Sequence, residues 1–348
     1  MSKKIYIPLP RNISVSVFEA LKLHESYFEG LGYEVKYLSR SKKIKDKRVF
    51  AVKSVFKTIK MLRSKDSGKI YCITVKEVLI GSLSNILAPK KEIIFWVQGL
   101  IDDEDLLSNN NKIRYYVFKN ILKICLRIST KLVVVTHQMF EVLKDSYSCP
   151  KSKLHIVIPC KSRVAYNGKE KTNNSLCYIG GLSKWQNVDK ILKFYNQLSA
   201  INSNYKLFIA TFNHDAANIL IENMVDKNYQ TNITLVNVSS TSEVQAFLSK
   251  MEYGFLIRDN IPLNNVASPI KLAEYLSCGV TPIISTSLIE FYQELRHWNC
   301  GVFIDNDFNL AIKNLLQNYP SPKKALDAYN NIYKPNNFED QLNIFLNK

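Results

Sequence analysis

The chain has 348 residues, of which 46% are hydrophobic, so it is too long for one comfortable core and two domains are expected. No apolar run approaches the roughly 18 residues that span a bilayer, and the N-terminus lacks the apolar region of a signal peptide, so we expect a cytoplasmic protein. The seven cysteines are scattered without a C-x-x-C pair, which excludes a cysteine-based zinc site and a disulfide framework.

The formal net charge of +17 requires an explanation, and nucleic acid, an anionic membrane surface and a phosphorylated small ligand are the candidate partners. The excess is concentrated in residues 36–69, in Lys36, Arg40, Lys42, Lys43, Lys45, Lys47, Arg48, Lys53, Lys57, Lys60, Arg63, Lys65 and Lys69. We expect no nucleic-acid binding, because these cations are not interleaved with stacking aromatics and no nucleic-acid module is evident. The segment therefore predicts either a contact with anionic membrane lipid or a solvated basic surface.

The first half of the chain predicts alternating strands and helices. Residues 4–8 form a strand, residues 9–14 a loop, and the amphipathic residues 15–31 a helix that leads to a second strand at 32–38. Further short apolar strands are expected at residues 69–74, 92–97, 131–136 and 155–159, with helices between most of them. This order is typical of a doubly wound parallel sheet, and we assign residues 1–160 to this first domain.

The second half repeats the pattern after a polar stretch. Residues 161–175 predict an interdomain linker, and residues 176–181 predict a strand that ends in the glycine turn Gly180-Gly181. The remaining strands, which alternate with helical patterns and complete a second doubly wound domain over residues 176–333, are expected at 205–210, 232–236, 252–257, 280–284 and 301–304. Ligands of such sheets bind outside the carboxyl ends of the strands.

The segment that begins at Ser268 places an anion site and a hydroxyl acceptor on one helix. Ser268 is a suitable N-cap and Pro269 a suitable first helical residue, which leaves the backbone N–H groups of the first turn free for an anion. Lys271 adds a charge at this end, and Glu274 follows about one turn later on nearly the same face, where a carboxylate can accept two vicinal hydroxyls. A diphosphate joined to a ribose fits this pair, and the alternative is an ordinary core helix.

The same segment resembles the donor-site signature of the glycosyltransferases of family four and their GT-B relatives, SP-x-K-x-x-EYLA-x-G-x-P-V-I. The resemblance implies two Rossmann-like domains that face a central cleft, with residues 334–348 as a helix that crosses back to the first domain. It implies that Glu274 reads the ribose of a sugar nucleotide and that the helix start holds the diphosphate, through Ser268, Pro269, Ile270 and Lys271. Val266 stands where the family usually has another glutamate, so a phosphoribosyl donor stays open as well.

Two further segments are expected at the diphosphate. The turn that contains Gly180, Gly181, Ser183 and Lys184 follows a strand, and its glycines allow close approach of the backbone to a phosphate. The family usually has an arginine at the position of Gly181 and a lysine at that of Gln186, and Lys184 either takes over this role or is a surface lysine. Arg258 follows the strand at 252–257, where its guanidinium suits a phosphate; the alternative is an ion pair with Asp259 on a surface loop.

The first domain supplies the residues expected on the acceptor or sugar side. They are Arg11, Asn12 and Ser14 in the loop after the first strand, Gln98 and Gly99 after the strand at 92–97, and His137 after the strand at 131–136. Gln98 stands where many family members carry a sugar-contacting histidine, and it can form hydrogen bonds but is not a strong base. For His137 a structural role is favoured over a role in the cleft. The acidic run Asp102-Asp103-Glu104 predicts a solvated helix N-terminus rather than catalysis or metal binding.

These residues and the resemblance predict a retaining glycosyltransferase that moves a sugar from a nucleotide-diphosphate donor to a glycan or lipid-linked acceptor in bacterial surface-polysaccharide biosynthesis. Arg258, Lys271 and Glu274 are the expected catalytic residues, and charge stabilisation of the leaving diphosphate replaces a metal ion; no cofactor is expected. The enzyme is expected to be cytoplasmic, either free or peripheral on the inner face of the cell membrane. The alternatives are a GT-B sugar-nucleotide epimerase and a non-catalytic protein that binds membrane or nucleic acid.

Overall fold

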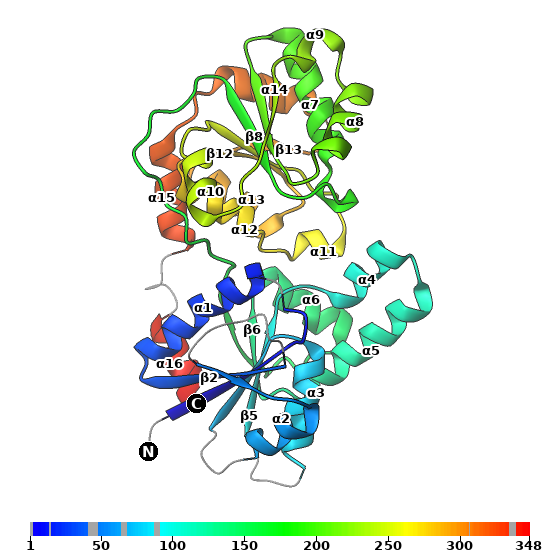
Figure 1. The fold of residues 1–348 in the computed structure, drawn as a ribbon, viewed down its shortest axis with the longest axis vertical. Coiled ribbons are helices and arrows are strands. Elements are labelled where there is room, and N and C mark those ends of the chain that lie inside the picture. Colours follow the sequence, from blue (N-terminus) through cyan, green and yellow to red (C-terminus); the bar gives the residue numbers. More distant parts are fainter. Residues whose placement is uncertain are drawn as a thin grey trace. The chain divides into compact units, whose positions relative to one another are not determined.

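The computed structural model describes residues 3–13, 15–40, 48–63, 68–86, 91–305, 307–333 and 339–348. Contacts divide the chain into two compact units, one formed by residues 1–159 with 335–348 and the other by residues 160–334 (Figure 1). Each unit contains one parallel sheet covered by helices, so the predicted pair of doubly wound α/β domains is confirmed. None of the helices in the described ranges is long and apolar enough to cross a bilayer.

The sheet of the first unit has seven parallel strands in the order β3-β2-β1-β4-β5-β6-β7. They are β1 (Lys3–Leu9), β2 (Tyr33–Ser39), β3 (Val49–Ala51), β4 (Lys69–Cys72), β5 (Glu92–Val97), β6 (Lys131–Val134) and β7 (Leu154–Val157). The inner strands are apolar on both faces because helices cover both, and Ile5, Ile94 and Val133 are fully buried. The edge strand β3 escapes prediction from the sequence, because three residues are too few to show a period.

Each helix of the first unit connects two strands, and the direction of that connection along the strand order determines which face of the sheet the helix covers. The helix α1 (Val15–Gly30) connects β1 to β2 in one direction. The helices that follow strands in the opposite direction are α2 (Val55–Leu62), α3 (Val75–Ser84), α5 (Lys112–Ile128) and α6 (His137–Tyr147). Since such crossovers are right-handed, α1 lies on one face and these four helices lie on the other (Figure 1). The short helix α4 (Ile101–Asn109) packs against α5.

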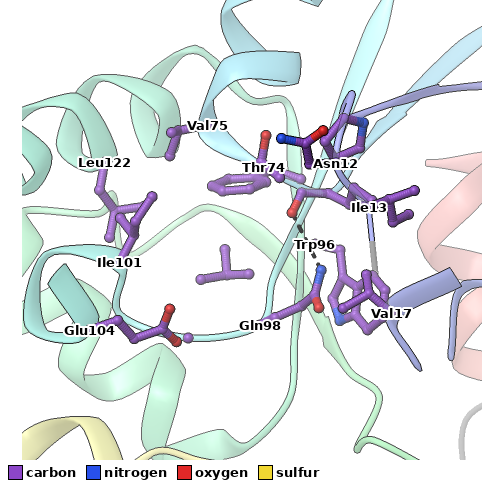
Figure 2. Close-up of a pocket in the computed structure, with 15 residues that line it drawn as sticks. Asn12, Ile13, Val17, Thr74, Val75, Trp96, Gln98, Ile101, Glu104 and Leu122 are labelled. Atoms are coloured by element: carbon purple, nitrogen blue, oxygen red, sulfur yellow. Dashed lines mark hydrogen bonds between the residues drawn. The ribbon is translucent and has the colours of Figure 1, made fainter. Parts of the chain in front are cut away.

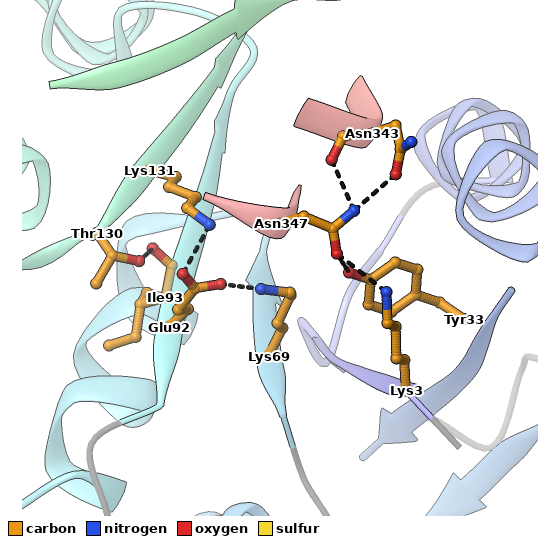
Figure 3. A network of polar contacts seen from close by, with 9 residues as sticks. All are labelled: Lys3, Tyr33, Lys69, Glu92, Ile93, Thr130, Lys131, Asn343 and Asn347. Carbon is orange, nitrogen blue, oxygen red and sulfur yellow. Dashed lines mark hydrogen bonds and ion pairs between the residues drawn. The ribbon is translucent and has the colours of Figure 1, made fainter. Parts of the chain in front are cut away.

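Polar residues at the amino ends of the strands join the sheet to the C-terminal helix α16 (Glu339–Asn347), as Figure 3 shows. Glu92 at the start of β5 pairs with Lys69 at the start of β4, and with Lys131 at the start of β6, where the Nζ–Oε1 distance is 2.7 Å. Lys3 at the start of β1 donates from Nζ to Asn347 Oδ1 at 3.0 Å. Structural contacts thus occupy this edge, whereas the loops of the opposite edge are available for a ligand.

The second unit has a six-stranded parallel sheet in the order β10-β9-β8-β11-β12-β13. Its strands are β8 (Ser175–Ile179), β9 (Lys206–Ala210), β10 (Ile233–Val236), β11 (Tyr253–Leu256), β12 (Thr281–Ser285) and β13 (Val302–Ile304). Its helices are the 3-10 turn η1 (Lys184–Gln186), α7 (Val188–Ile201), α8 (His214–Met224), α9 (Lys227–Gln230), α10 (Thr241–Leu248), α11 (Pro262–Asn265), α12 (Ile270–Ser277), α13 (Ile289–His297), α14 (Phe308–Gln317) and α15 (Pro322–Ile332). Two separate apolar clusters, one around Phe194 and one around Tyr275, give the unit its core.

The polar residues 161–175, which the sequence suggests as a linker, lie along the second unit. The N–H of Tyr166 donates to the carbonyl of Ser277 at 2.7 Å, and Lys171 Nζ donates to the carbonyl of Cys278 at 2.8 Å. Both carbonyls belong to the end of α12, where helical partners are missing. The stretch therefore satisfies the backbone groups at the C-terminus of the helix that begins at the candidate site.

Candidate functional site

The turn after β8 leaves room for a cation. Gly180 has φ +140°, and a Cβ at this position would collide with the Nζ and Cε atoms of Lys271. The hydroxyl of Tyr178 donates to the carbonyl of Gly181 at 2.5 Å and thereby holds the turn in place. The glycine predicted from the sequence to let a phosphate approach thus lets the Lys271 ammonium approach the turn.

Two cations from different elements meet at one amide oxygen. Arg258, directly after β11 and Ile257, donates from Nη2 to Gln186 Oε1 at 2.8 Å, and Lys271 in the first turn of α12 donates from Nζ to the same oxygen at 2.5 Å. Lys271 Nζ also donates to the hydroxyl of Tyr178 at 3.1 Å and lies 4.6 Å from the centre of its ring. Among the residues that the structure describes, no carboxylate forms an ion pair with either cation. The predicted alternative for Arg258 is wrong in this respect, because Asp259 pairs with Lys190 at 2.5 Å instead.

Burial changes the protonation of this cluster. Desolvation and, after it, the neighbouring charge of Arg258 lower the pKa of Lys271 to about 7, while Glu274 opposes the shift. Desolvation likewise lowers the pKa of Arg258. Glu274, about one turn after Lys271 on α12, has its pKa raised to about 7 by desolvation, with Lys271 acting in the opposite direction. The cations and the carboxylate therefore lie in a poorly hydrated site, where an anion that binds interacts strongly with the positive charges.

The start of α12 differs from the expectation in one respect. Pro269, not Ser268, is the N-cap, with φ −73° and ψ 123°, and the helix begins at Ile270. Ser268 Oγ instead accepts a hydrogen bond from the N–H of Cys160 at 2.9 Å, so it fixes the entry of the chain into the second unit. The backbone N–H groups of Ile270 and Lys271 form no hydrogen bond with the described residues, which leaves the helix start open to an anion.

Other residues predicted near the diphosphate lie less close to this cluster. Ser183 and Lys184 are exposed in and before η1, and no hydrogen bond or ion pair joins the Lys184 side chain to the described residues. Gln186, which the sequence only marked as a departure from the family, is the residue that connects the two cations. Val266 is fully buried behind the short helix α11 and offers no polar group.

The first unit contains a cavity of about 470 Å³ at the carboxyl ends of β1, β4 and β5 (Figure 2). Three of the residues predicted for the acceptor side, Asn12, Gln98 and Gly99, line it. Gln98 Nε2 donates to the carbonyl of Ile73 at 3.3 Å, which holds its amide against β4. Most other lining residues are apolar, and they include Ile13, Val17, Ile73, Val75, Phe95, Trp96, Ile101 and Leu122.

The remaining acceptor-side predictions have different outcomes. Arg11 is exposed and is not among the lining residues, and Ser14 lies outside the described residues. His137 is the exposed first residue of α6 and does not line the cavity either. The structure therefore gathers Asn12, Gln98 and Gly99 at one place and leaves Arg11 and His137 apart from them.

The acidic run after Gly99 lies in the first turn of α4, as the sequence suggested, but only part of it is solvated. Asp102 is fully buried, and its two carboxylate oxygens share the proton of the Tyr147 hydroxyl at 2.9 Å and 2.8 Å. Desolvation, followed by the charge of Asp102, raises the pKa of Asp103 to about 6. Glu104 lines the cavity with its carboxylate close to Gly99 (Figure 2), and desolvation raises its pKa too. Sequence reasoning missed Glu104; its signal was its position one helical turn after a buried strand and a glycine.

A metal site is not part of this arrangement. No group of three or more His, Cys, Asp or Glu side chains in the described part of the chain is placed to hold an ion. The charges at the start of α12 are cationic, and cations of this kind suit direct contact with a phosphate.

Two parallel α/β units of this kind define the GT-B class of fold, and solved structures of that class match over nearly the whole chain. Sucrose-phosphate synthase from Thermosynechococcus elongatus is similar with a TM-score of 0.75 at 12% identity, over 99% of this chain and 98% of that one. Anabaena HepE in complex with UDP and glucose gives a TM-score of 0.70 at 10% identity, over 99% of both chains. The lipopolysaccharide outer core galactosyltransferase WaaB gives 0.68 at 12% identity, over 99% of this chain and 100% of that one.

The family follows from the second unit. Residues 163–334 match the model of the family described as glycosyl transferases group 1, so the second unit is a domain of this family. The prediction of a glycosyltransferase is therefore confirmed, and the alternative of a non-catalytic binding protein is not. No curated protein sequence matches the chain closely enough to add a nearer relative.

Proposed function

We propose that the protein transfers a glycosyl group from a nucleoside-diphosphate sugar and that Arg258 and Lys271 hold the diphosphate. The supporting observation is that two half-buried basic side chains share one neutral amide oxygen, Gln186 Oε1, with no carboxylate of the described residues paired to either. A diphosphate supplies the negative charge that this pair lacks, because charged hydrogen bonds are stronger than those to an amide. The similar HepE was solved with UDP and glucose, which supports a donor of this chemical class.

The same cluster would stabilise the leaving group. Negative charge grows on the diphosphate oxygen as the glycosidic bond breaks, and fixed cations in a poorly hydrated place stabilise that charge without reorganisation. The leaving diphosphate can then take the acceptor proton on the same face of the sugar, which corresponds to retention of configuration. We propose this metal-independent route, with Glu274 at the ribose hydroxyls and the free N–H groups of Ile270 and Lys271 at a phosphate.

We propose that the acceptor is held by the cavity of the first unit, with residues 1–160 as acceptor domain and residues 176–333 as donor domain. Gln98 and Glu104 are among the polar residues that line the cavity, and desolvation raises the pKa of the Glu104 carboxyl above its usual value. The mostly apolar lining favours an acceptor with an apolar part, such as a lipid-linked glycan in surface-polysaccharide biosynthesis. Gly180, Gly181, Ser183, Ser268 and Pro269 would shape the donor site through the backbone.

Thermal stability in the presence of nucleotides tests the donor site. We would compare UDP, GDP and uridine on the unmodified protein, on Arg258→Ala and on the matched control Lys193→Ala, an exposed lysine of α7. A diphosphate present at a hundredfold its dissociation constant should add about 2.7 kcal/mol of stability, and Arg258→Ala should remove most of this gain while the control keeps it. An equal gain in all three proteins, or an equal gain with uridine, would contradict the proposal.

A further inference from the structure

The face of the first unit that carries α2, α3 and α5 exposes a row of large apolar side chains on α3. Leu79, Leu83 and Ile86, just beyond the end of the helix, follow one another at intervals of four and three residues, and all three are exposed. This spacing places side chains on one side of a helix. The opposite side of α3 buries Val78 and Ile80 toward the sheet. The row therefore faces away from the core of its own unit.

A second row lies on α5, which packs against α3 on the same face of the sheet (Figure 1). Ile113, Val117 and Ile124 are 78%, 51% and 52% exposed, and the neighbouring Tyr116 is 62% exposed. The side of α5 that meets the unit already buries Leu122, among others. An exposed aliphatic row of this size on a helix indicates a surface that binds another molecule or a membrane.

The helices of this face carry mainly positive charge, although Arg114 is paired with Asp105 of α4 at 2.6 Å. The helices α2, α3 and α5 contain eight lysines and arginines: Lys57, Lys60, Lys76, Lys112, Arg114, Lys119, Lys123 and Arg127. Their single acid, Glu77, is buried and accepts a hydrogen bond from Arg40 at 3.1 Å. On α5 the residues Lys112, Lys123 and Arg127 share a row with Tyr116, directly beside the apolar row.

We propose that this surface, the α2–α3–α5 face, binds an anionic lipid bilayer. The two aliphatic rows would enter the boundary between headgroups and acyl chains, and the adjacent cations would contact lipid phosphates. A second copy of the chain fits less well, because a two-fold contact would place the same positive surface against itself. Nucleic acid fits less well too, because Leu, Ile and Val do not provide the aromatic planes on which bases stack.

This surface is a different one from the basic segment 36–69 as a whole. Four cations of that segment form ion pairs within the first unit, namely Lys36, Arg40, Arg48 and Lys69, so their charges are already matched. Residues 41–47 and 64–67 of the segment lie outside the described residues. The part that the α2–α3–α5 face includes is α2, where Lys57 and Lys60 are exposed next to Phe56.

Flotation of the full chain with vesicles tests the proposal independently of transferase activity. The vesicles are phosphatidylcholine alone and a mixture of phosphatidylcholine with phosphatidylglycerol. The variants are an apolar triple, Ile113→Ser with Val117→Ser and Ile124→Ser, and a charge triple, Lys112→Gln with Lys123→Gln and Arg127→Gln. The matched control changes three exposed aliphatic residues of the second unit, Ile201→Ser with Ile219→Ser and Leu310→Ser.

The unmodified protein and the control should float with the mixed vesicles and not with phosphatidylcholine alone. Each of the other two variants should bind the mixed vesicles at least tenfold more weakly, and for the charge triple at low salt the loss should approach about a hundredfold. Melting temperatures serve as the folding control. The proposal is overturned by equal binding to both vesicle types, by no binding, by an apolar triple that binds as well as the control, or by a dimer in solution that the apolar triple dissociates.

Discussion

Replacement of Lys271 by methionine should make the protein more stable and weaken its binding of a diphosphate at least tenfold. The ammonium is mostly buried, and its neighbours are a second cation, an amide oxygen and a phenol. Its pKa falls from 10.5 to about 7, which at about 1.4 kcal/mol per pKa unit gives an upper limit of about 5 kcal/mol for the cost of keeping it charged. Solvent relaxation reduces this cost, and the substitution also loses two hydrogen bonds of about 1 kcal/mol each. A net gain of about 1–2 kcal/mol is therefore expected for Lys271→Met.

The sign of this effect depends on pH. The lowered pKa of Lys271 means that the unfolded chain binds more protons than the folded one between about pH 7 and 10.5. The cost of the charge is therefore complete below pH 7 and disappears as the pH approaches 10.5. The stabilisation by Lys271→Met should accordingly be largest at pH 6 and absent or reversed at pH 10.

Urea unfolding at pH 6 and pH 10 measures this difference, with Lys193→Met on the surface of α7 as a control that should show no change at either pH. The thermal shift caused by UDP or GDP is measured on the same samples and should be much smaller in Lys271→Met at the same ligand concentration. A loss of stability at pH 6 would refute the reasoning, because Lys271 would then be a structural residue that contributes favourable contacts to the free protein.

Three other predictions concern the same site. Glu274→Ala should weaken the binding of UDP by about 2–4 kcal/mol and should abolish the preference for UDP over its 2′-deoxy analogue. Titration calorimetry measures both effects. An unchanged preference would show that Glu274 does not bind the ribose. Gln186→Glu supplies a carboxylate to Arg258 and Lys271, so it should raise the melting temperature and lower diphosphate affinity at least tenfold, whereas a rise in affinity would place the phosphate elsewhere. Glycosyl transfer should persist in excess EDTA; complete loss that Mg²⁺ restores would show that these cations do not suffice.

The order of the elements follows from the sequence because apolar strands and turn residues are local features. The strand at 92–97 coincides with β5, and most others begin or end within two residues of the expected positions. The strand β3 is the exception, since only its pairing with β2 makes it a strand. Long-range pairing of this kind leaves no pattern in three residues.

The candidate site was predictable where one segment carries several of its residues, and not where side chains from distant segments meet. Lys271 and Glu274 are three residues apart on α12, so helix geometry places them on nearly the same face. Ser268 has the composition of an N-cap, but a hydrogen bond from Cys160, more than a hundred residues earlier, decides its role. Gln186 acquires its importance from Arg258 and Lys271 on other elements, and Glu104 from its place in the lining of the cavity, which a single sequence does not show.

A double-mutant cycle on nucleotide binding tests the central claim most directly, that Arg258 and Lys271 hold one diphosphate. Titration calorimetry would compare UDP or GDP with the corresponding nucleoside on the unmodified protein, Arg258→Ala, Lys271→Met and the double variant. Each single change should weaken diphosphate binding at least tenfold and leave nucleoside binding unchanged, and the two losses should be non-additive by 0.5 kcal/mol or more, as expected for residues that share one partner. Additive losses that affect the nucleoside as strongly as the diphosphate would contradict the account.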